Sequence, residues 1–282
     1  MTNTLPTHLD IWQSTLNWQP TAEQQRLFQA LYAQILEGNK QLNLTRITEP
    51  DEFWEKHLWD SLSGLAPWLS DMTEASLSTT ETETDPETET DPEAETEVGI
   101  ENQSALEIDE SVPLRIIDIG TGGGFPGIPA AIALSPLTID ITLLDATRKK
   151  IFFLQTLCHQ LGLSATCIPE RAEALGRDPE HRETYDLALI RAVGSAATCA
   201  EYVMPFLKVG GQAVIYRGQW TTADTETLIP VIDLLGGELT DLQSWQTPLT
   251  QSNRHCLFIH KEQPIAQDFP RAIGVPGKLP LT

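Results

Sequence analysis

The sequence has few of the features that mark secreted, membrane or metal-binding proteins. It holds 4 cysteines, and none stands in a Cys-x-x-Cys pair, which argues against a zinc or disulfide framework; we expect reduced, buried thiols and no metal. No apolar run approaches about 18 residues, so no membrane span is predicted. The first ten residues, MTNTLPTHLD, lack a basic stretch followed by an apolar one, so we expect a cytoplasmic protein without a signal peptide.

Positive charge is also scarce, because 18 Lys and Arg face 40 Asp and Glu and give a net charge of −22. Much of this imbalance is local. Residues 72–114 contain 14 acids and no Lys or Arg, and removing these charges leaves −8 for the rest of the chain. The block reads TTETETDPETETDPEAETE at its centre and holds too little apolar surface to fold. We therefore predict a disordered acidic insertion over 71–112, and polyanion binding elsewhere would need a local basic patch.

The most informative stretch is LRIIDIGTGGGFPG, residues 114–127. An apolar run containing Asp118 leads into a cluster of glycines, and Pro126 then opens an apolar segment of helical length. A strand, a tight glycine turn and a helix start bring backbone close to a ligand.

The glycine spacing allows two ligand classes. Gly122, Gly124 and Gly127 match G-x-G-x-x-G, which indicates a dinucleotide and a nicotinamide-dependent oxidoreductase. However, Gly127 follows Pro126, which places it inside the helix start rather than at the close-packing point of that motif. A strand ending in D-x-G-x-G fits better and is typical of methyltransferases that bind S-adenosylmethionine. The loop has no Lys or Arg, which agrees with a cofactor that carries no phosphate.

The chain divides into a helical part and an alternating part. Thr21 and Gln24 form a capping-box pattern at the start of a helix that Gly38 would end, and a second helix is predicted to begin near residues 48–50. We expect four regions: an N-terminal helical extension (1–70), the acidic insertion (71–112), a methyltransferase domain (113–264) and a C-terminal tail (265–282).

Strands and helices alternate after the acidic block. This order predicts an α/β fold with a doubly wound, mostly parallel sheet, and the last two strands should form an antiparallel hairpin at its edge because only turn residues separate them. The predicted strands are 114–119, 139–144, 165–169, 185–190, 211–216, 238–244 and 254–260, and the predicted helices are 126–134, 147–162, 195–207 and 221–236.

Polar side chains follow three of the predicted strands, at the edge where ligands bind in such sheets. Asp145 could accept the two ribose hydroxyls of a nucleoside, or cap the next helix. Ala172 and Glu173 could read an adenine edge, although Glu173 could equally be a solvated acid of a helix's first turn. Arg191 could pair with a cofactor carboxylate or a phosphate, or form a structural ion pair.

Two other clusters carry weaker signals. Arg148, Lys149 and Lys150 begin a predicted helix, but charges on a helix usually form a solvated face and do not by themselves indicate nucleic acid. His57 and Asp60 stand three apart on the second helix. Among apolar neighbours, His57 reads as a hydrogen-bonded core histidine rather than as half of a functional pair.

Taken together, the motifs resemble the bacterial family that methylates N7 of a guanine in the 530 loop of 16S ribosomal RNA. The similarity covers about the whole chain except the acidic block, which departs from the family pattern. It is carried by NKQLNLTRI (39–47), EKHLWDSL (55–62), IDIGTGGGFPGIPAAI (117–132), LLDATRKKIFFL (143–154), RAEAL (171–175), LIRAVG (189–194) and FPRAIGVPGKLPL (269–281).

The resemblance implies a class I methyltransferase fold that uses S-adenosylmethionine. Its substrate would be 16S ribosomal RNA or the small ribosomal subunit, modified at guanine 527, and we expect a monomer. No catalytic base is needed, since guanine N7 carries an exposed lone pair. An assembly factor without turnover is the alternative. The implied cofactor contacts are Gly120, Phe125, Asp145, Ala146, Thr147, Ala172, Glu173 and Arg191.

Overall fold

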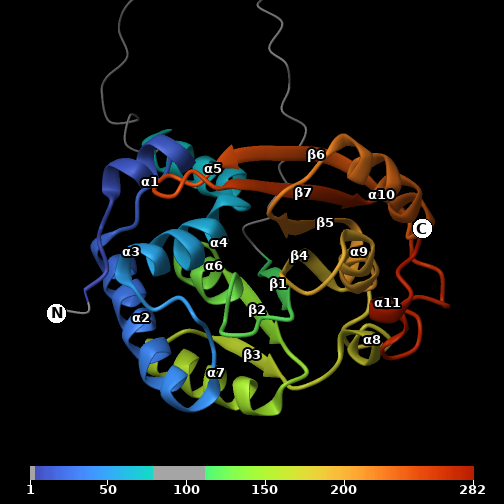
Figure 1. Ribbon diagram of the computed structural model, residues 1–282, viewed down its shortest axis with the longest axis horizontal. Helices are drawn as coiled ribbons and strands as arrows, with labels where there is room; N and C mark the ends of the chain where they lie inside the picture. Colours follow the sequence, from blue (N-terminus) through green and yellow to red (C-terminus); the bar gives the residue numbers. More distant parts are fainter. Residues whose placement is uncertain (1–3, 79–111) are drawn as a thin grey trace, which may run out of the picture.

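The computed structural model describes residues 4–78 and 112–282, and a seven-stranded sheet lies at its centre (Figure 1). The strand order is β3-β2-β1-β4-β5-β7-β6; the first five strands run parallel, and β7 is antiparallel to both β5 and β6. The predicted fold class and the edge hairpin are confirmed. The strands are β1 (Leu114–Ile119), β2 (Ile139–Leu144), β3 (Ala165–Ile168), β4 (Tyr185–Arg191), β5 (Leu207–Arg217), β6 (Gly237–Gln246) and β7 (Asn253–Lys261).

Helices cover both faces of this sheet and also precede it in the chain. Among the described residues, none of them combines the length and the apolar content that crossing a membrane requires. The helices are α1 (Leu9–Leu16), α2 (Ala22–Leu42), α3 (Pro50–Phe53), the π-helix η1 (Trp54–Trp59), α4 (Asp60–Ser63), α5 (Ala66–Ser78), α6 (Gly127–Ala133), α7 (Arg148–Leu161), α8 (Ala172–Leu175), α9 (Ala196–Val203), α10 (Thr222–Leu234) and α11 (Val275–Lys278).

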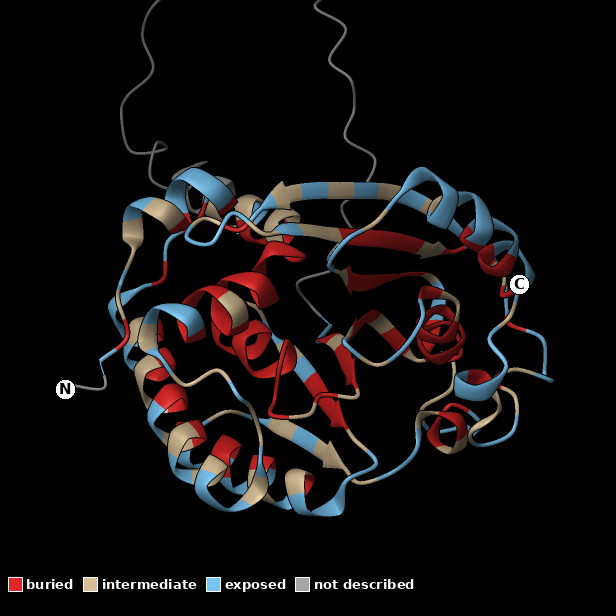
Figure 2. Cartoon of the chain, viewed as in Figure 1, coloured by how far each residue is buried: buried red, intermediate tan, exposed pale blue. Residues whose placement is uncertain are grey.

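Alternation along the central strands builds two hydrophobic clusters, one on each face of the sheet. On β1, Ile116 packs with α6, α7 and the N-terminal helices, whereas Ile117 packs with α8, α9 and α10. The central strands β1, β4 and β5 are mostly buried on both faces, as Figure 2 shows for the centre of the molecule. The N-terminal helices therefore share a core with one face of the sheet and bring their side chains to its edge.

The first N-terminal helix of the prediction is longer than expected. Its capping box is present, since Thr21 accepts the N–H of Gln24 and the Gln24 side chain accepts the N–H of Thr21. The predicted end at Gly38 is wrong, because α2 continues to Leu42. A Cβ atom on Gly38 would lie 2.3 Å from the ring of Phe153. The glycine therefore permits close packing of α2 on α7 instead of ending the helix.

The acidic block lies mostly outside the described residues. Helix α5 extends past residue 71, where we expected the insertion to begin, and reaches Ser78. Residues 79–111, which hold most of the predicted insertion, are not among those described. The four cysteines are free, and three are buried while Cys167 is half-buried.

Gly127 occupies a more crowded position than its sequence context suggested. It is the first residue of α6, and a Cβ atom there would lie 2.4 Å from Leu143 Cδ2 and 2.7 Å from Asp118 Oδ2. Gly127 thus lies at the helix start, as expected, but it is also a close-packing glycine between helix and strand, so the expectation that it lies away from such a point is wrong. This position consequently does not separate a dinucleotide loop from an S-adenosylmethionine loop.

We predict that Gly127→Ala lowers the free energy of unfolding by about 1–3 kcal/mol, because the added methyl group must displace packed atoms. Gly218→Ala is the matched control, since no atom lies within 4 Å of a Cβ there, and its effect should stay within about 0.5 kcal/mol. Urea unfolding of both variants measures the difference. Equal stability of the two would contradict the packing assigned to Gly127.

Candidate functional site

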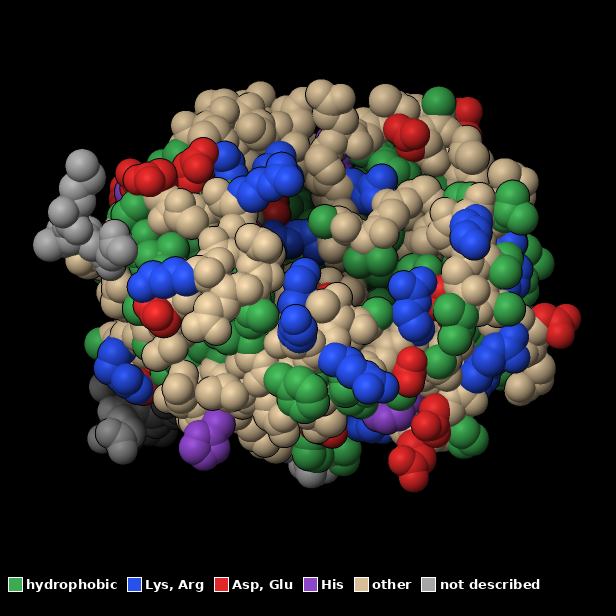
Figure 3. Space-filling model, turned by 60° about the horizontal axis from the view of Figure 1, so that its bottom comes forward, with side chains coloured by type: hydrophobic (Ala, Val, Ile, Leu, Met, Phe, Trp, Pro, Cys, Tyr) green, Lys and Arg blue, Asp and Glu red, His purple; other side chains and the backbone are tan. Residues whose placement is uncertain are grey.

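A cavity of 690 Å³ lies at the carboxyl ends of the parallel strands. It sits where β1 and β4 are neighbours, which is the point where an open α/β sheet reverses its winding and binds ligands. Figure 3 shows a hollow on this side of the molecule, bordered by Lys and Arg side chains. The structure brings every predicted site residue to the wall of this one cavity: Gly120, Phe125, Asp145, Ala146, Thr147, Ala172, Glu173 and Arg191.

The glycine loop forms the floor of the cavity and needs its glycines for two reasons. Gly120, Gly122 and Gly124 have φ of 71°, 60° and 96°, a region that side chains disfavour. In addition, a Cβ atom on Gly120 would lie 2.5 Å from Cγ2 of Val193, which follows β4. Because these three residues have no side chains, nothing of their own separates the loop backbone from a ligand.

Asp118 fixes the loop from below. Its side chain is fully buried in β1, and its Oδ2 accepts the N–H of Gly127 at 2.8 Å. Burial raises the pKa of this carboxyl group to about 6. The bond joins the strand before the loop to the helix after it, so the loop between them is held at both ends.

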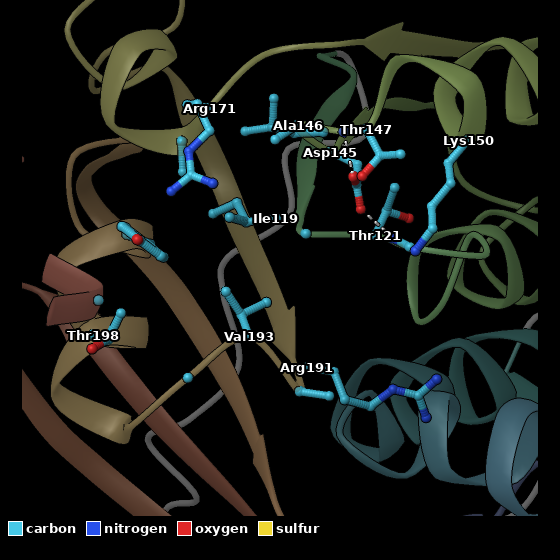
Figure 4. Close-up of a pocket in the computed structure, with 18 of the residues that line it drawn as sticks. Ile119, Thr121, Asp145, Ala146, Thr147, Lys150, Arg171, Arg191, Val193 and Thr198 are labelled. Atoms are coloured by element: carbon cyan, nitrogen blue, oxygen red, sulfur yellow. Dashed lines mark hydrogen bonds between the residues drawn. The ribbon is translucent and has the colours of Figure 1, made fainter. Parts of the chain in front are cut away.

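Asp145 lies beside the loop with its carboxylate locked by backbone donors (Figure 4). Oδ2 accepts the N–H of Gly122 at 3.0 Å, and Oδ1 accepts the N–H of Thr147 at 2.7 Å. The second bond lies before the helix, because Thr147 is itself the N-cap of α7, so Asp145 is not the helix cap that one interpretation expected. However, each carboxylate oxygen can accept about two hydrogen bonds, so both retain an acceptor site for a ligand hydroxyl. The ribose interpretation is therefore compatible with the two backbone bonds of Asp145.

Glu173 is not the solvated acid that one interpretation expected. Its side chain is 1% exposed. Oε1 accepts the hydroxyl of Tyr202 at 3.1 Å, the N–H of Gly274 at 2.8 Å and a guanidinium N–H of Arg171 at 3.3 Å. This carboxylate ties the loop after β3 to α9 and to the C-terminal tail.

The C-terminal tail forms part of the wall, which our sequence reasoning did not assign to the site. Gly277 and Pro280 line the cavity. The tail is anchored by Arg271, whose guanidinium contacts both carboxylate oxygens of the buried Glu201, with a shortest distance of 2.6 Å. Composition and spacing give no signal for this role. Only the similarity of residues 269–281 to the family could have indicated it.

Arg191 at the end of β4 belongs to an ion-pair cluster. Its Nη1 lies 2.7 Å from Asp60 Oδ2 and donates to the carbonyl of Lys56, and Arg254 Nε lies 3.0 Å from Asp60 Oδ1. Figure 4 shows the side chain directed toward the N-terminal helices. The ion-pair interpretation is thus confirmed, although Arg191 also borders the cavity. Two guanidinium groups on one carboxylate leave an excess of one positive charge there.

His57 borders the cavity from the π-helix η1. π-helical turns are rare and often occur at functional sites. The imidazole stacks on Phe125 at 4.3 Å, and Nε2 lies 2.7 Å from Thr45 Oγ1. Burial, together with Arg191 and Lys56, lowers the pKa of His57 to about 3, so the ring is neutral. His57 and Asp60 have different partners, and the structure does not make them a pair.

The buried, neutral His57 predicts a specific pH dependence of stability. Between about pH 3 and 6.5 the unfolded chain protonates this ring and the folded protein does not, so acid favours unfolding. The free energy of unfolding of the wild type, minus that of His57→Gln, should fall by about 1.4 kcal/mol per pH unit below pH 6.5. Urea titrations from pH 5 to 8 measure it; a difference that stays constant over this range would contradict a neutral His57.

Comparisons with known proteins agree on one family. The family described as rRNA small subunit methyltransferase G (GidB) matches residues 24–73 and 102–257, and the gap falls in the acidic block. Proteins named ribosomal RNA small subunit methyltransferase G are 50% identical in Nostoc sp. (100% of both chains), 46% in Synechococcus elongatus (96% of this chain, 95% of the relative) and 43% in Trichodesmium erythraeum (98% and 94%).

These matches cover nearly the full length of the relatives as well as of this chain. They also include the residues that form the glycine loop and the ends of β2, β3 and β4. The nicotinamide-dependent oxidoreductase alternative finds no support in them. The chain belongs to the rRNA small subunit methyltransferase G family.

Proposed function

We propose that this protein transfers the methyl group of S-adenosylmethionine to N7 of a guanine in the 530 loop of 16S ribosomal RNA, at position 527. Family membership supports the reaction and the RNA. The observation that carries the proposal is the cavity at the β1/β4 switch point, where all eight expected cofactor contacts meet. Its 690 Å³ lie within the range of about 300–1,000 Å³ typical of small-molecule sites.

The residues present fit this cofactor at its ribose end. Asp145 is already held by two backbone N–H groups, and its free acceptor sites suit the two ribose hydroxyls. The open backbone of Gly120 would lie against the methionine part. Phe125, Ala146 and Thr147 complete this side of the wall.

The adenine and carboxylate ends have separate supports. Ala172 begins α8, where backbone N–H groups lack helical partners and can read an adenine edge. Glu173 would hold this loop in place through its bonds to Tyr202 and Gly274. The excess positive charge of Arg191 and Arg254 over Asp60 favours a carboxylate nearby.

For this reaction the protein has to position the two reactants and exclude water from between them. The bound cofactor supplies an electrophilic methyl group, and guanine N7 supplies a lone pair without losing a proton. Leu44, His57 and Phe125 offer an uncharged wall against which a base can lie. Correct placement in a dry cavity would then account for the rate, with no general base. We further propose that the protein acts as a monomer in the cytoplasm.

We predict that Asp145→Asn raises the dissociation constant for S-adenosylmethionine by about 10- to 100-fold, because charge-assisted hydrogen bonds to the ribose are lost. Asp140→Asn is the matched control: Asp140 lies on β2, the strand that precedes Asp145, and is half-exposed beside Arg115. Calorimetric titration of both variants with the cofactor measures the difference. Unchanged binding by Asp145→Asn would remove Asp145 from the cofactor site.

Radiolabelled S-adenosylmethionine and small ribosomal subunits that lack the modification test the reaction itself. The wild-type protein should place the label in 7-methylguanosine of 16S ribosomal RNA. Asp145→Asn should lose this activity at low cofactor concentration and regain it at saturation. Cofactor binding without transfer to subunits or to free 16S ribosomal RNA would favour the assembly-factor alternative.

A further inference from the structure

The first turn of α7 carries a charge arrangement that does not stabilise the helix. Arg148, Lys149 and Lys150 stand where the helix dipole is positive, and the turn contains no acid. Thr147 at the N-cap accepts no hydrogen bond with its side chain. Within the described parts of the chain, none of the three cations has an ion-pair partner. Their presence therefore costs folding stability and calls for another explanation.

An exposed aromatic side chain lies on the same face of the helix. Phe152 is 62% exposed, whereas its neighbour Phe153 packs against Gly38. Phe152 follows Arg148 by four residues and Lys149 by three, so the three side chains are neighbours on the helix surface. A single exposed phenylalanine needs no explanation. An exposed aromatic ring beside cations that lack ion-pair partners, however, is the combination that binds single-stranded nucleic acid, because the cations contact phosphates and the ring stacks on a base.

This face continues directly from the rim of the cavity. Thr147 at the N-cap of α7 and Lys150 in its first turn line the cavity, and Figure 4 shows Lys150 directed toward Thr121 of the glycine loop. Arg148, Lys149 and Phe152 lie outside this rim on the exposed side of the helix. A polynucleotide whose target base enters the cavity would therefore pass its neighbouring nucleotides across α7.

Charge argues for RNA as the occupant of this face. The chain carries a net charge of −22, so its overall field repels a polyanion. Attraction must come from local cations that are not already neutralised. Arg148 and Lys149 meet this condition, whereas Arg191 and Arg254 share Asp60 and keep one positive charge between them, which we assign to the cofactor carboxylate.

We propose that the outer face of α7 is an RNA-binding surface, on which Arg148 and Lys149 contact phosphates and Phe152 stacks on an unpaired base close to the target guanine. The proposal rests on the proposed function. It adds the path of the RNA outside the cavity and a base other than the one that is methylated. The sequence analysis interpreted the cluster Arg148, Lys149 and Lys150 as a solvated helix face, and the proposal assigns RNA to this face instead.

Steady-state methyl transfer to unmodified small subunits, measured across a range of salt concentrations, tests the two kinds of contact separately. Phe152→Ala should lower kcat/KM by about 5- to 150-fold with an unchanged salt dependence, and Phe152→Trp should restore it. Arg148→Gln and Lys149→Gln should each reduce the slope of log kcat/KM against log salt concentration by about 0.7. Leu234→Ala, which is 56% exposed on α10, is the control and should behave as the wild type.

A photo-crosslinking phenylalanine derivative introduced at position 152, or at position 234 as the control, identifies what this face touches in the complex with the small subunit. A crosslink to 16S ribosomal RNA at position 152 alone supports the proposal. A crosslink to a ribosomal protein, or none above the control, overturns it, as does wild-type activity of Phe152→Ala. If the wild-type protein transfers no methyl group, the proposed function fails, while the crosslink still decides whether α7 binds RNA.

Discussion

The hydrogen bond from Gly127 to the buried Asp118 is the constraint on which the site depends. It joins β1 to α6 across the glycine loop, in a place where a side chain on residue 127 would collide with Leu143 and Asp118. Because the loop is held at both ends, the N–H of Gly122 within it can donate a hydrogen bond to Asp145, which follows β2. The floor of the cavity and its acidic wall are thus positioned by one contact in the core. The arrangement costs free energy because the carboxyl group of Asp118 is buried at the centre of the sheet, and this burial raises its pKa to about 6.

Local sequence signals were sufficient for the fold and for the residues at the strand ends that line the cavity. Apolar runs and turn residues located the seven strands, and the absence of a helix between the last two predicted their antiparallel pairing. Asp145 and Arg191 could be found because ligands bind where parallel strands end. These rules use only residues that are close in sequence and the general order of strands in such a sheet, and both can be read from the sequence.

Such rules do not predict contacts between segments that lie far apart in the sequence. Gly38 looked like a helix end and is not one, whereas Gly127 does begin a helix. At both positions another element packs closely, and only the partners Phe153 and Leu143 reveal this. Glu173 looked as much like a surface acid as a site residue because its partners lie on α9 and in the tail. The π-helix that carries His57 was likewise not predicted, because the sequence pattern indicated only a helix beginning near residues 48–50.

The cavity draws its wall from Leu44 near one end of the chain, Asp145 in the middle and Pro280 near the other end. A ligand that fills it therefore binds only when all three segments are folded together. Ligand concentration thus becomes a term in the stability of the whole chain, worth about 2.7 kcal/mol at a hundredfold excess over the dissociation constant. The N-terminal helices and the C-terminal tail would then loosen together as the ligand is depleted, although they lie far apart in the sequence.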